Sequence, residues 1–378
     1  MPSQECVGRE ALGALVLLLF LSGMAVGRAP SPITLSAGSW KITLGGYVKL
    51  DLIHDFNAIG STDFDPRAIP VDGSQGTDTQ VDARETRLSL GFVGPAEGRD
   101  LKLYVEGDFF GTSNAFRLRH AYGQYGILLA GQTWTTFMDE LNLPPTIDFE
   151  KALAAPLVRQ GLVRVTAPLS KRTELAFGIE EPGPEIQIPA GIDGAIEKNL
   201  PDFTGRVRWT HSRGHLQVSG FLGNTRFRPT TGEPMDVTIG GVLVSGRLNC
   251  FDRDAAYVEV AYGPGLGRYR GATTARFDST GQLKAEEVVA FTVGYERYWS
   301  SRWSSNAVVA PAWVLSDFGD PAVSNDKLNY VAVNLKYWFL LQRAWAGVEY
   351  LYGRREVRSG ANGSANRIQF AVRFNILR

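Results

Sequence analysis

Segments in which apolar and polar side chains alternate recur along most of the chain. In the last of them, Ile368, Phe370 and Val372 alternate with Arg367 and Gln369. A period of two residues is that of a β-strand, whose successive side chains point to opposite faces. We count about 16 such segments of roughly ten residues, the length of a tilted strand that spans a membrane. They cover residues 43–56, 85–93, 101–109, 116–123, 127–135, 163–165, 174–180, 203–210, 216–222, 237–248, 255–262, 289–296, 304–315, 328–339, 343–356 and 367–376.

The connections between these segments alternate strictly between long and short. Long connections start near residues 57, 111, 136, 181, 226, 263, 316 and 357, and short ones lie near 95, 125, 168, 212, 250, 300 and 340. Outer-membrane barrels have short periplasmic turns and long external loops. A soluble β-protein also alternates apolar with polar residues, but it does not sort its loops by length. The sequence therefore predicts an all-β fold, a transmembrane antiparallel β-barrel of about 16 strands with both termini on the periplasmic side.

The first residues have the features of a secretory signal peptide. Arg9 precedes an apolar stretch over residues 11–21, and small residues around Ala25 and Gly27 offer a cleavage site. We therefore expect a signal peptide at residues 1–27, a short N-terminal segment at 28–42 and the barrel at 43–378. Export followed by insertion into the outer membrane of a Gram-negative cell is the predicted route, with membrane lipid as a partner.

Cysteine content and charge exclude some classes of protein. Cys6 falls within the expected signal peptide and Cys250 stays alone, so no disulfide framework is predicted. Lysine plus arginine (39) equals aspartate plus glutamate (39), which indicates no nucleic-acid partner. His211 and His215 flank a turn, but no further cysteine or histidine lies nearby, so we expect no metal site and no cofactor.

One long connection differs from the others in its charge. Residues 136–156 show no strand alternation, contain adjacent prolines at 144 and 145, and carry the carboxylates Asp139, Glu140, Asp148 and Glu150. We interpret this segment as a loop that folds into the barrel and narrows it, since a barrel of this size encloses water.

Cations share the polar parity of the strands before and after this loop, except Arg159 at the end of the loop, whose parity disagrees with that of Arg164. Arginine keeps its charge and binds planar carboxylates through two parallel hydrogen bonds. The predicted pore-lining cations are Lys49, Arg87, Lys102, Arg117, Arg119, Arg159, Arg164, Arg206 and Arg208. In the alternative interpretation, the arginines only form structural ion pairs with the neighbouring carboxylates Glu85, Glu106, Asp108 and Glu174.

A specific arrangement follows for the constriction. We expect Arg117 and Arg119 to face the four loop carboxylates across the narrowest section, which would create a transverse field. On this hypothesis, replacing both arginines reduces the preference for anions and leaves the fold nearly intact.

Four short segments resemble those of a known family, and the resemblance is strongest over residues 43–166. They are Gly46-Tyr47-Val48-Lys49-Leu50-Asp51, Arg119-His120-Ala121-Tyr122-Gly123, Gly131-Gln132-Thr133-Trp134-Thr135-Thr136-Phe137 and Pro144-Pro145-Thr146-Ile147-Asp148-Phe149. Together they resemble the DcaP-like outer-membrane porins. The resemblance implies a homotrimer of 16-stranded barrels that passes small anionic solutes, dicarboxylates especially.

Other functions stay open at this point. Within the porins, the alternative is a phosphate- or polyphosphate-selective channel, which lysine clusters would favour; here arginine dominates the inward parity. An outer-membrane enzyme would need a catalytic geometry that the sequence does not establish. An adhesin would need longer external loops than those predicted.

Overall fold

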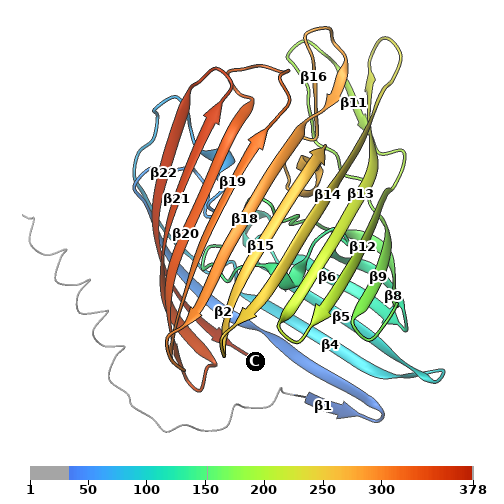
Figure 1. Cartoon of the computed structure of the whole chain (residues 1–378), viewed down its shortest axis with the longest axis vertical. Helices are drawn as coiled ribbons and strands as arrows, with labels where there is room; N and C mark the ends of the chain where they lie inside the picture. Colours follow the sequence, from blue (N-terminus) through green and yellow to red (C-terminus); the bar gives the residue numbers. More distant parts are fainter. Residues whose placement is uncertain (1–33, 151, 377–378) are drawn as a thin grey trace, which may run out of the picture. The chain divides into compact units, whose positions relative to one another are not determined.

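Sixteen strands of the described residues form one closed antiparallel barrel (Figure 1). The computed structural model describes residues 34–150 and 152–376, so the expected signal peptide lies outside the described residues. Each barrel strand pairs with the next one along the chain, and β22 (Asn362–Asn375) closes the barrel against β2 (Trp40–Asp55). The other barrel strands are β4 (Arg87–Ala96), β5 (Arg99–Asp108), β6 (Arg117–Tyr125), β7 (Leu128–Trp134), β8 (Arg159–Pro168), β9 (Thr173–Glu180), β12 (Asp202–His211), β13 (Gly214–Pro229), β14 (Met235–Cys250), β15 (Asp254–Pro264), β18 (Glu287–Tyr298), β19 (Trp303–Val314), β20 (Asn325–Phe339) and β21 (Ala344–Val357). The predicted fold class is confirmed.

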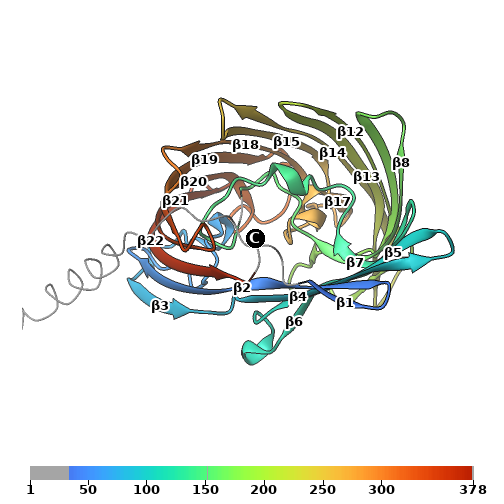
Figure 2. The ribbon, with the colours of Figure 1, turned by 90° about the horizontal axis from the view of Figure 1, so that it is seen from below.

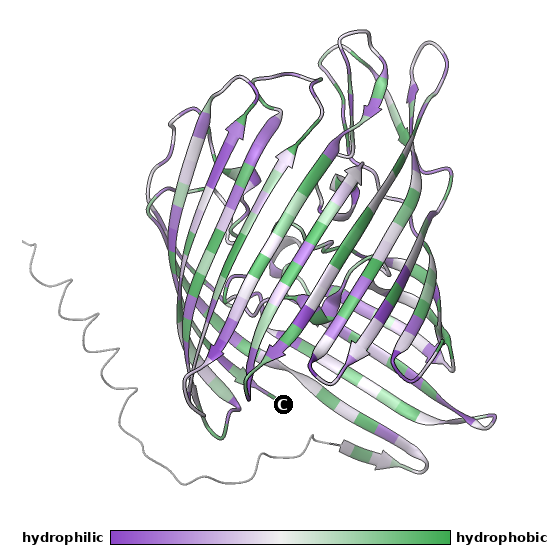
Figure 3. Cartoon of the chain, in the orientation of Figure 1, coloured by the Kyte–Doolittle hydropathy of each residue, from purple (hydrophilic) through white to green (hydrophobic). Residues whose placement is uncertain are grey.

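The alternation in the sequence sets which side chains face outward. On β2, Val48 and Leu50 are about half exposed on the outer face, whereas Lys49 and Asp51 are buried on the inner face. Hydrophobic and hydrophilic residues also alternate along many of the other barrel strands (Figure 3). An apolar outer face is required because a charge facing lipid costs about 2–4 kcal/mol near the midplane.

Some strands extend beyond their predicted ends. The alternation predicted 216–222, but β13 continues to Pro229, with Phe227 turned inward and Arg226 and Arg228 outward. This extension carries polar residues on its outer face, so it lacks the apolar pattern of a lipid-facing strand. The tight β4–β5 turn also comes later than predicted, because Glu97 (φ 46°) and Gly98 (φ 81°) adopt the left-handed conformations of a two-residue hairpin.

Smaller elements occupy the connections, and the alternation did not predict them. β1 (Thr34–Ala37) pairs with the start of β2, and β11 (Gly194–Glu197) pairs with the end of β13. β10 (Ile186–Gln187), β16 (Ala275–Phe277) and β17 (Leu283–Ala285) form a separate small sheet. The 3₁₀ turns are η1 (Pro66–Ala68), η2 (Thr112–Asn114), η3 (Glu140–Asn142) and η4 (Leu266–Tyr269). In the described part of the chain, no helix is long and apolar enough to span a membrane.

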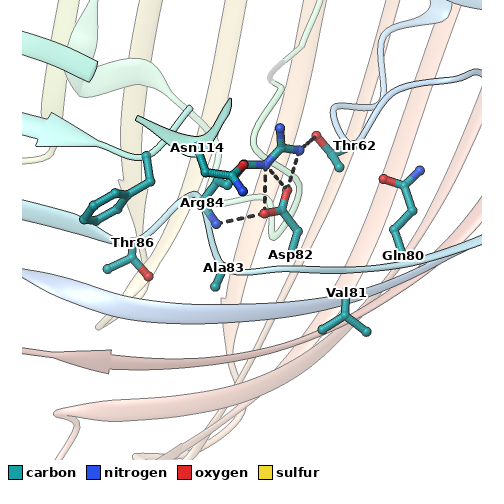
Figure 4. Close-up of a pocket in the computed structure, with 9 residues that line it drawn as sticks. Thr62, Gln80, Val81, Asp82, Ala83, Arg84, Thr86 and Asn114 are labelled. Carbon is teal, nitrogen blue, oxygen red and sulfur yellow. Dashed lines mark hydrogen bonds and ion pairs between the residues drawn. The ribbon is translucent and has the colours of Figure 1, made fainter. Parts of the chain in front are cut away.

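The wall is interrupted beside β3 (Asp78–Asp82). β3 and β4 both pair with β2, but residues 83–86 break the ladder between them. An open pocket of about 530 Å³ lies at this break (Figure 4). Arg84 points into it but is bonded to Asp82 at 2.8 Å and to Thr62 at 2.8 Å. Because that guanidinium is already paired, the pocket offers no free cation from Arg84.

The exposed parts of the long loops lead to a prediction about topology. A protease applied to intact cells should cut within residues 72–77 or 279–282, which are mostly exposed, and should spare the turn at Glu97 and Gly98. Mass spectrometry of the fragments locates the cuts. Cleavage confined to the short turns would mean that the barrel has the opposite orientation.

Candidate pore constriction

The loop between β7 and β8 lies inside the barrel. We call residues 135–158 the inner loop; Lys151 within it is not described. Seen from below, it runs along the inside of the wall (Figure 2). Its course can be followed by its contacts: Asn142 donates to the Val258 carbonyl of β15 (2.9 Å), and Lys336 of β20 donates to the Pro145 carbonyl (2.5 Å). The expectation that this segment folds inward agrees with its contacts.

Inward-facing side chains of the wall bind the backbone of the inner loop. Ser219 and Gln217 of β13 donate to the carbonyls of Phe137 (2.6 Å) and Met138 (3.2 Å). Farther along, the carboxylate of Glu349 on β21 accepts from the backbone N–H groups of Ile147 and Asp148 at 2.6–3.0 Å. A buried loop must have its backbone polar groups paired, and these strands supply the partners.

Glycines on the inner face let the loop approach the wall closely. A Cβ atom at Gly294 would lie 3.0 Å from Pro144, and one at Gly347 would lie 2.8 Å from Ile147. Side chains at these two positions would therefore push the inner loop toward the lumen.

Most of the predicted arginines are in ion pairs. Arg117 bonds to Asp108 at 2.8 Å, and Arg119 bonds to Asp108 (2.8 Å) and Glu106 (2.9 Å). On β12, Arg206 lies 3.0 Å from Glu174, and Arg208 lies 3.2 Å from Asp139. The pairs with Asp108, Glu106 and Glu174 fit the alternative interpretation, whereas the pair of Arg208 with Asp139 joins a wall arginine to a carboxylate of the inner loop.

Three predicted cations have no such pair. No carboxylate of the described residues lies within ion-pair distance of Lys102, Arg159 or Arg164. Arg159 instead stacks on the Trp134 ring, 4.4 Å from its centroid. Arg87 lies 4.0 Å from Glu106, which is the longest distance at which an ion pair is counted. Lys49 is buried in a cluster with Glu85 and Asp51.

The cations form two neighbouring groups on the wall from β4 to β12. Arg159 lies within electrostatic range of Arg87, Arg117 and Arg119, and Arg206 lies within range of Arg164 and Arg208. β8 carries a member of each group, so the two groups adjoin along one strand. The sequence parity had left Arg159 ambiguous because it disagrees with Arg164; the contact with Trp134 explains how Arg159 joins the first group.

The prediction that Arg117 and Arg119 lie opposite the loop carboxylates is wrong. Among the described residues of the inner loop, Phe149 contacts these arginines: its ring centroid lies 5.9 Å from Arg117 and 5.6 Å from Arg119. Arg87 also lies over this ring, at 5.8 Å. Carboxylates of the neighbouring strand β5 bind Arg117 and Arg119 instead. The two-residue period of the sequence does not show whether an inward arginine pairs with a carboxylate of a neighbouring strand or with one of the inner loop.

The four loop carboxylates have other partners. Asp139 accepts from Arg208, His215 (2.7 Å) and Ser245 (2.7 Å). Burial alone would raise the pKa of Asp139, but the hydrogen bonds from His215 and Ser245 and the charge of Arg208 lower it overall. Exposed Glu140 lies within electrostatic range of Arg206. The acidic end of the loop therefore faces the arginines of β12 instead of those of β6.

The other end of the inner loop is held by two arginines that the sequence analysis did not select. Glu150 pairs with Arg270 at 2.8 Å, and Asp148 lies 3.3 Å from Arg367. Burial raises the pKa of Asp148 well above its usual range, although the charge of Arg367 opposes this. Arg367 shares the inward parity of β22, which was visible in the sequence, but its partners lie hundreds of residues away.

Part of the lumen is filled by apolar side chains, contrary to the polar inner face that we expected. Phe137 of the inner loop packs with Phe221 and with Tyr269 of η4, and Phe64 packs near Tyr330. The inner faces of β15, β18, β19 and β20 contribute to the same cluster. Their members are Ala261, Ala290, Val308, Ala310, Ala312, Leu328, Tyr330 and Ala332. Continuous apolar runs such as residues 307–313 are the sequence signal of strands buried on both faces.

The geometry described so far defines a membrane channel of the porin type: a closed barrel with an apolar outer face, an inner loop and a cationic inner wall. The chain matches the family described as DcaP outer membrane protein over residues 18–376, and it belongs to this family. It is therefore an outer-membrane protein.

Solved structures show the same fold. The outer membrane channel DcaP of Acinetobacter baumannii has a TM-score of 0.81 and 22% identity, covering 92% of this chain and 100% of its own. An anion-selective porin from Comamonas acidovorans has a TM-score of 0.60 and 11% identity (89% and 99% covered). OmpT of Vibrio cholerae, in its trimer form, has a TM-score of 0.59 and 12% identity (89% and 100% covered). Comparison with curated proteins gave no match.

Proposed function

We propose that this protein is a porin through which small anionic solutes, dicarboxylates in particular, diffuse passively. The observation that supports this most is the excess of cations on one wall: Arg159 and Arg164 have no carboxylate partner among the described residues, and each belongs to a group of arginines. A wall of this charge raises the local concentration of anions and speeds their entry.

The water-filled path of this proposal runs along β4 to β12. Loops pack against the inner faces of β15 to β20 in a hydrophobic cluster. On the opposite side, inward side chains keep contact with water: the Arg117 side chain is 36% exposed and that of Glu174 is 34% exposed. Solutes that take this path pass Phe149 and both groups of arginines.

The scarcity of lysines along the path favours carboxylates over phosphates as the solute. The planar guanidinium binds both anions through two hydrogen bonds, whereas phosphate sites commonly add lysine as a point charge. Of the two lysines predicted to line the pore, Lys49 is buried and bonded to the Ile147 carbonyl (2.7 Å), and exposed Lys102 lies near the periplasmic end of β5. We also propose that the protein forms a homotrimer and binds neither a cofactor nor a metal. The similar porin OmpT of Vibrio cholerae was solved in a trimer form.

Planar-bilayer recording tests the proposal. In a potassium chloride gradient, the reversal potential should have the sign of chloride permeation, and succinate should reduce the chloride current at lower concentration than pyrophosphate does. A cation-selective reversal potential would contradict the proposal. Stronger inhibition by pyrophosphate would favour the phosphate-selective alternative, and absence of conductance would favour an enzyme or an adhesin.

A further inference from the structure

A groove of about 390 Å³ lies on the outward face of the barrel, over β12 to β15. Leu216, Gly246 and Val258 are register partners across β13, β14 and β15. Leu216 and Val258 are about half exposed, and Gly246 between them has no side chain, so the surface is recessed there. The remaining outward side chains of the groove are Val244, Leu248, Ala256 and Val260. The groove is therefore almost entirely apolar.

One end of the groove carries a cation and an aromatic pair. Trp209 stacks on His211 with 5.6 Å between ring centroids and 22° between planes. Arg213, in the turn between β12 and β13, lines the same groove. Its backbone N–H donates to His211 and its carbonyl accepts from Asn249, but its guanidinium bonds to none of the described residues. The positive charge of Arg213 therefore has no ion-pair partner among the described residues.

Neighbouring short turns add to this positive charge. The Thr210 N–H donates to the Arg172 carbonyl (2.7 Å) and the Asn249 N–H to the Arg213 carbonyl (2.6 Å), which places these turns side by side. Lys171 lies next to Arg172, and Arg253 lies in the β14–β15 turn together with Asp252. The short turns of an outer-membrane barrel lie at the periplasmic surface, at the level of the lipid headgroups.

We propose that the groove binds one phospholipid of the periplasmic leaflet, with an acyl chain over Gly246 and the phosphate at Arg213. An acyl chain gains van der Waals packing in the recess over Gly246, and each nearby arginine attracts the phosphate. A volume of this size is in the range of small-ligand sites. A folded protein domain is a poorer occupant, because the groove lies in the face that the barrel turns toward lipid.

Native mass spectrometry of the full-length mature protein, titrated with phosphatidylglycerol in detergent, tests this proposal. The wild-type protein should retain one lipid per chain. Ala256→Leu fills the groove and Arg213→Gln removes the cation, and each should weaken lipid binding by about tenfold. Ala307→Leu, on the outward face of β19, and Arg302→Gln, in the β18–β19 turn, are matched controls that should bind as the wild type does.

Heat-modifiable migration on gels shows that each variant is folded. If Ala256→Leu does not fold, Gly246→Val fills the same groove from the neighbouring strand. Retention of no lipid by the wild type would overturn the proposal, and so would equal retention by all variants. Loss in Arg213→Gln but not in either groove-filling variant would place the lipid on the turns and would overturn the groove as its site.

Discussion

Replacing Arg367 by methionine should lower the free energy of unfolding by about 3–5 kcal/mol, because it leaves the buried carboxylate of Asp55 without its cation. Arg367 is fully buried, and its guanidinium bonds to both carboxylate oxygens of Asp55 at 2.7 and 2.9 Å. It also donates to the carbonyls of Ser61 and Thr62 (2.6 Å each) and lies 3.3 Å from Asp148. One side chain thus joins β22, β2, the first external loop and the inner loop.

The same substitution should alter the channel. Without Arg367, the inner loop loses a partner at Asp148 and the first external loop loses two, so both should move more freely. We expect noisier single-channel currents together with a lower urea midpoint of unfolding in detergent. Both quantities can be measured on the same preparation.

A charge-matched variant separates the ion pair from simple packing. Adding Asp55→Asn to Arg367→Met removes the carboxylate that has lost its cation, so part of the lost stability should return. Arg367→Lys keeps the charge but not the paired hydrogen bonds, and we expect an intermediate value. A single Arg367→Met variant with wild-type stability and quiet currents would show that this cluster does not hold the loops.

Replacing Arg159 and Arg164 together by glutamine should reduce the anion-to-cation permeability ratio by about two- to fivefold at low salt. Neither arginine has an ion-pair partner among the described residues, so the change removes positive charge without leaving a buried carboxylate unpaired. Stability should stay close to that of the wild type. The reversal potential in a potassium chloride gradient measures the ratio, and raising the salt concentration should shrink the difference between the proteins.

Two further double variants serve as controls for this result. Arg253→Gln with Arg302→Gln removes the same charge from the short turns and should change the ratio less. Arg117→Gln with Arg119→Gln also lowers the positive charge of the wall, but it leaves buried Asp108 without its two cations and should reduce stability as well. Unchanged selectivity in the Arg159 and Arg164 variant would mean that these arginines do not line the conducting path.

The strands were predictable because their signal is local. A lipid-facing strand must place apolar side chains at every second position, and β2 shows this with Val48 and Leu50 outside and Lys49 and Asp51 inside. Arg119, Arg206 and Arg208, which have the polar parity, are buried. Where the outer face meets water instead of lipid, as around Arg226 and Arg228, outward side chains need not be apolar. The alternating pattern therefore stops there, and the predicted strand was shorter than β13.

The partners of the inward side chains were not predictable in the same way. Parity states that Arg117 faces inward, but not whether its carboxylate comes from β5 or from the inner loop. The answer depends on strand register: Asp108 is the register partner of Arg117 on β5 and lies near enough to bind it. A two-residue period contains no information about register with a neighbouring strand.

By itself the sequence determined the fold class, the approximate number of strands, the sorting of long and short connections, and the face on which most charges of the predicted strands lie. The tertiary structure alone decided the course of the inner loop, the apolar cluster that fills part of the lumen, and the pairing of Asp148 with Arg367 and of Ile147 with Glu349. The reason is physical. The lipid constrains each strand separately through its outer face, whereas the lumen is shaped by contacts between residues far apart in the chain, which exist only when the barrel has closed.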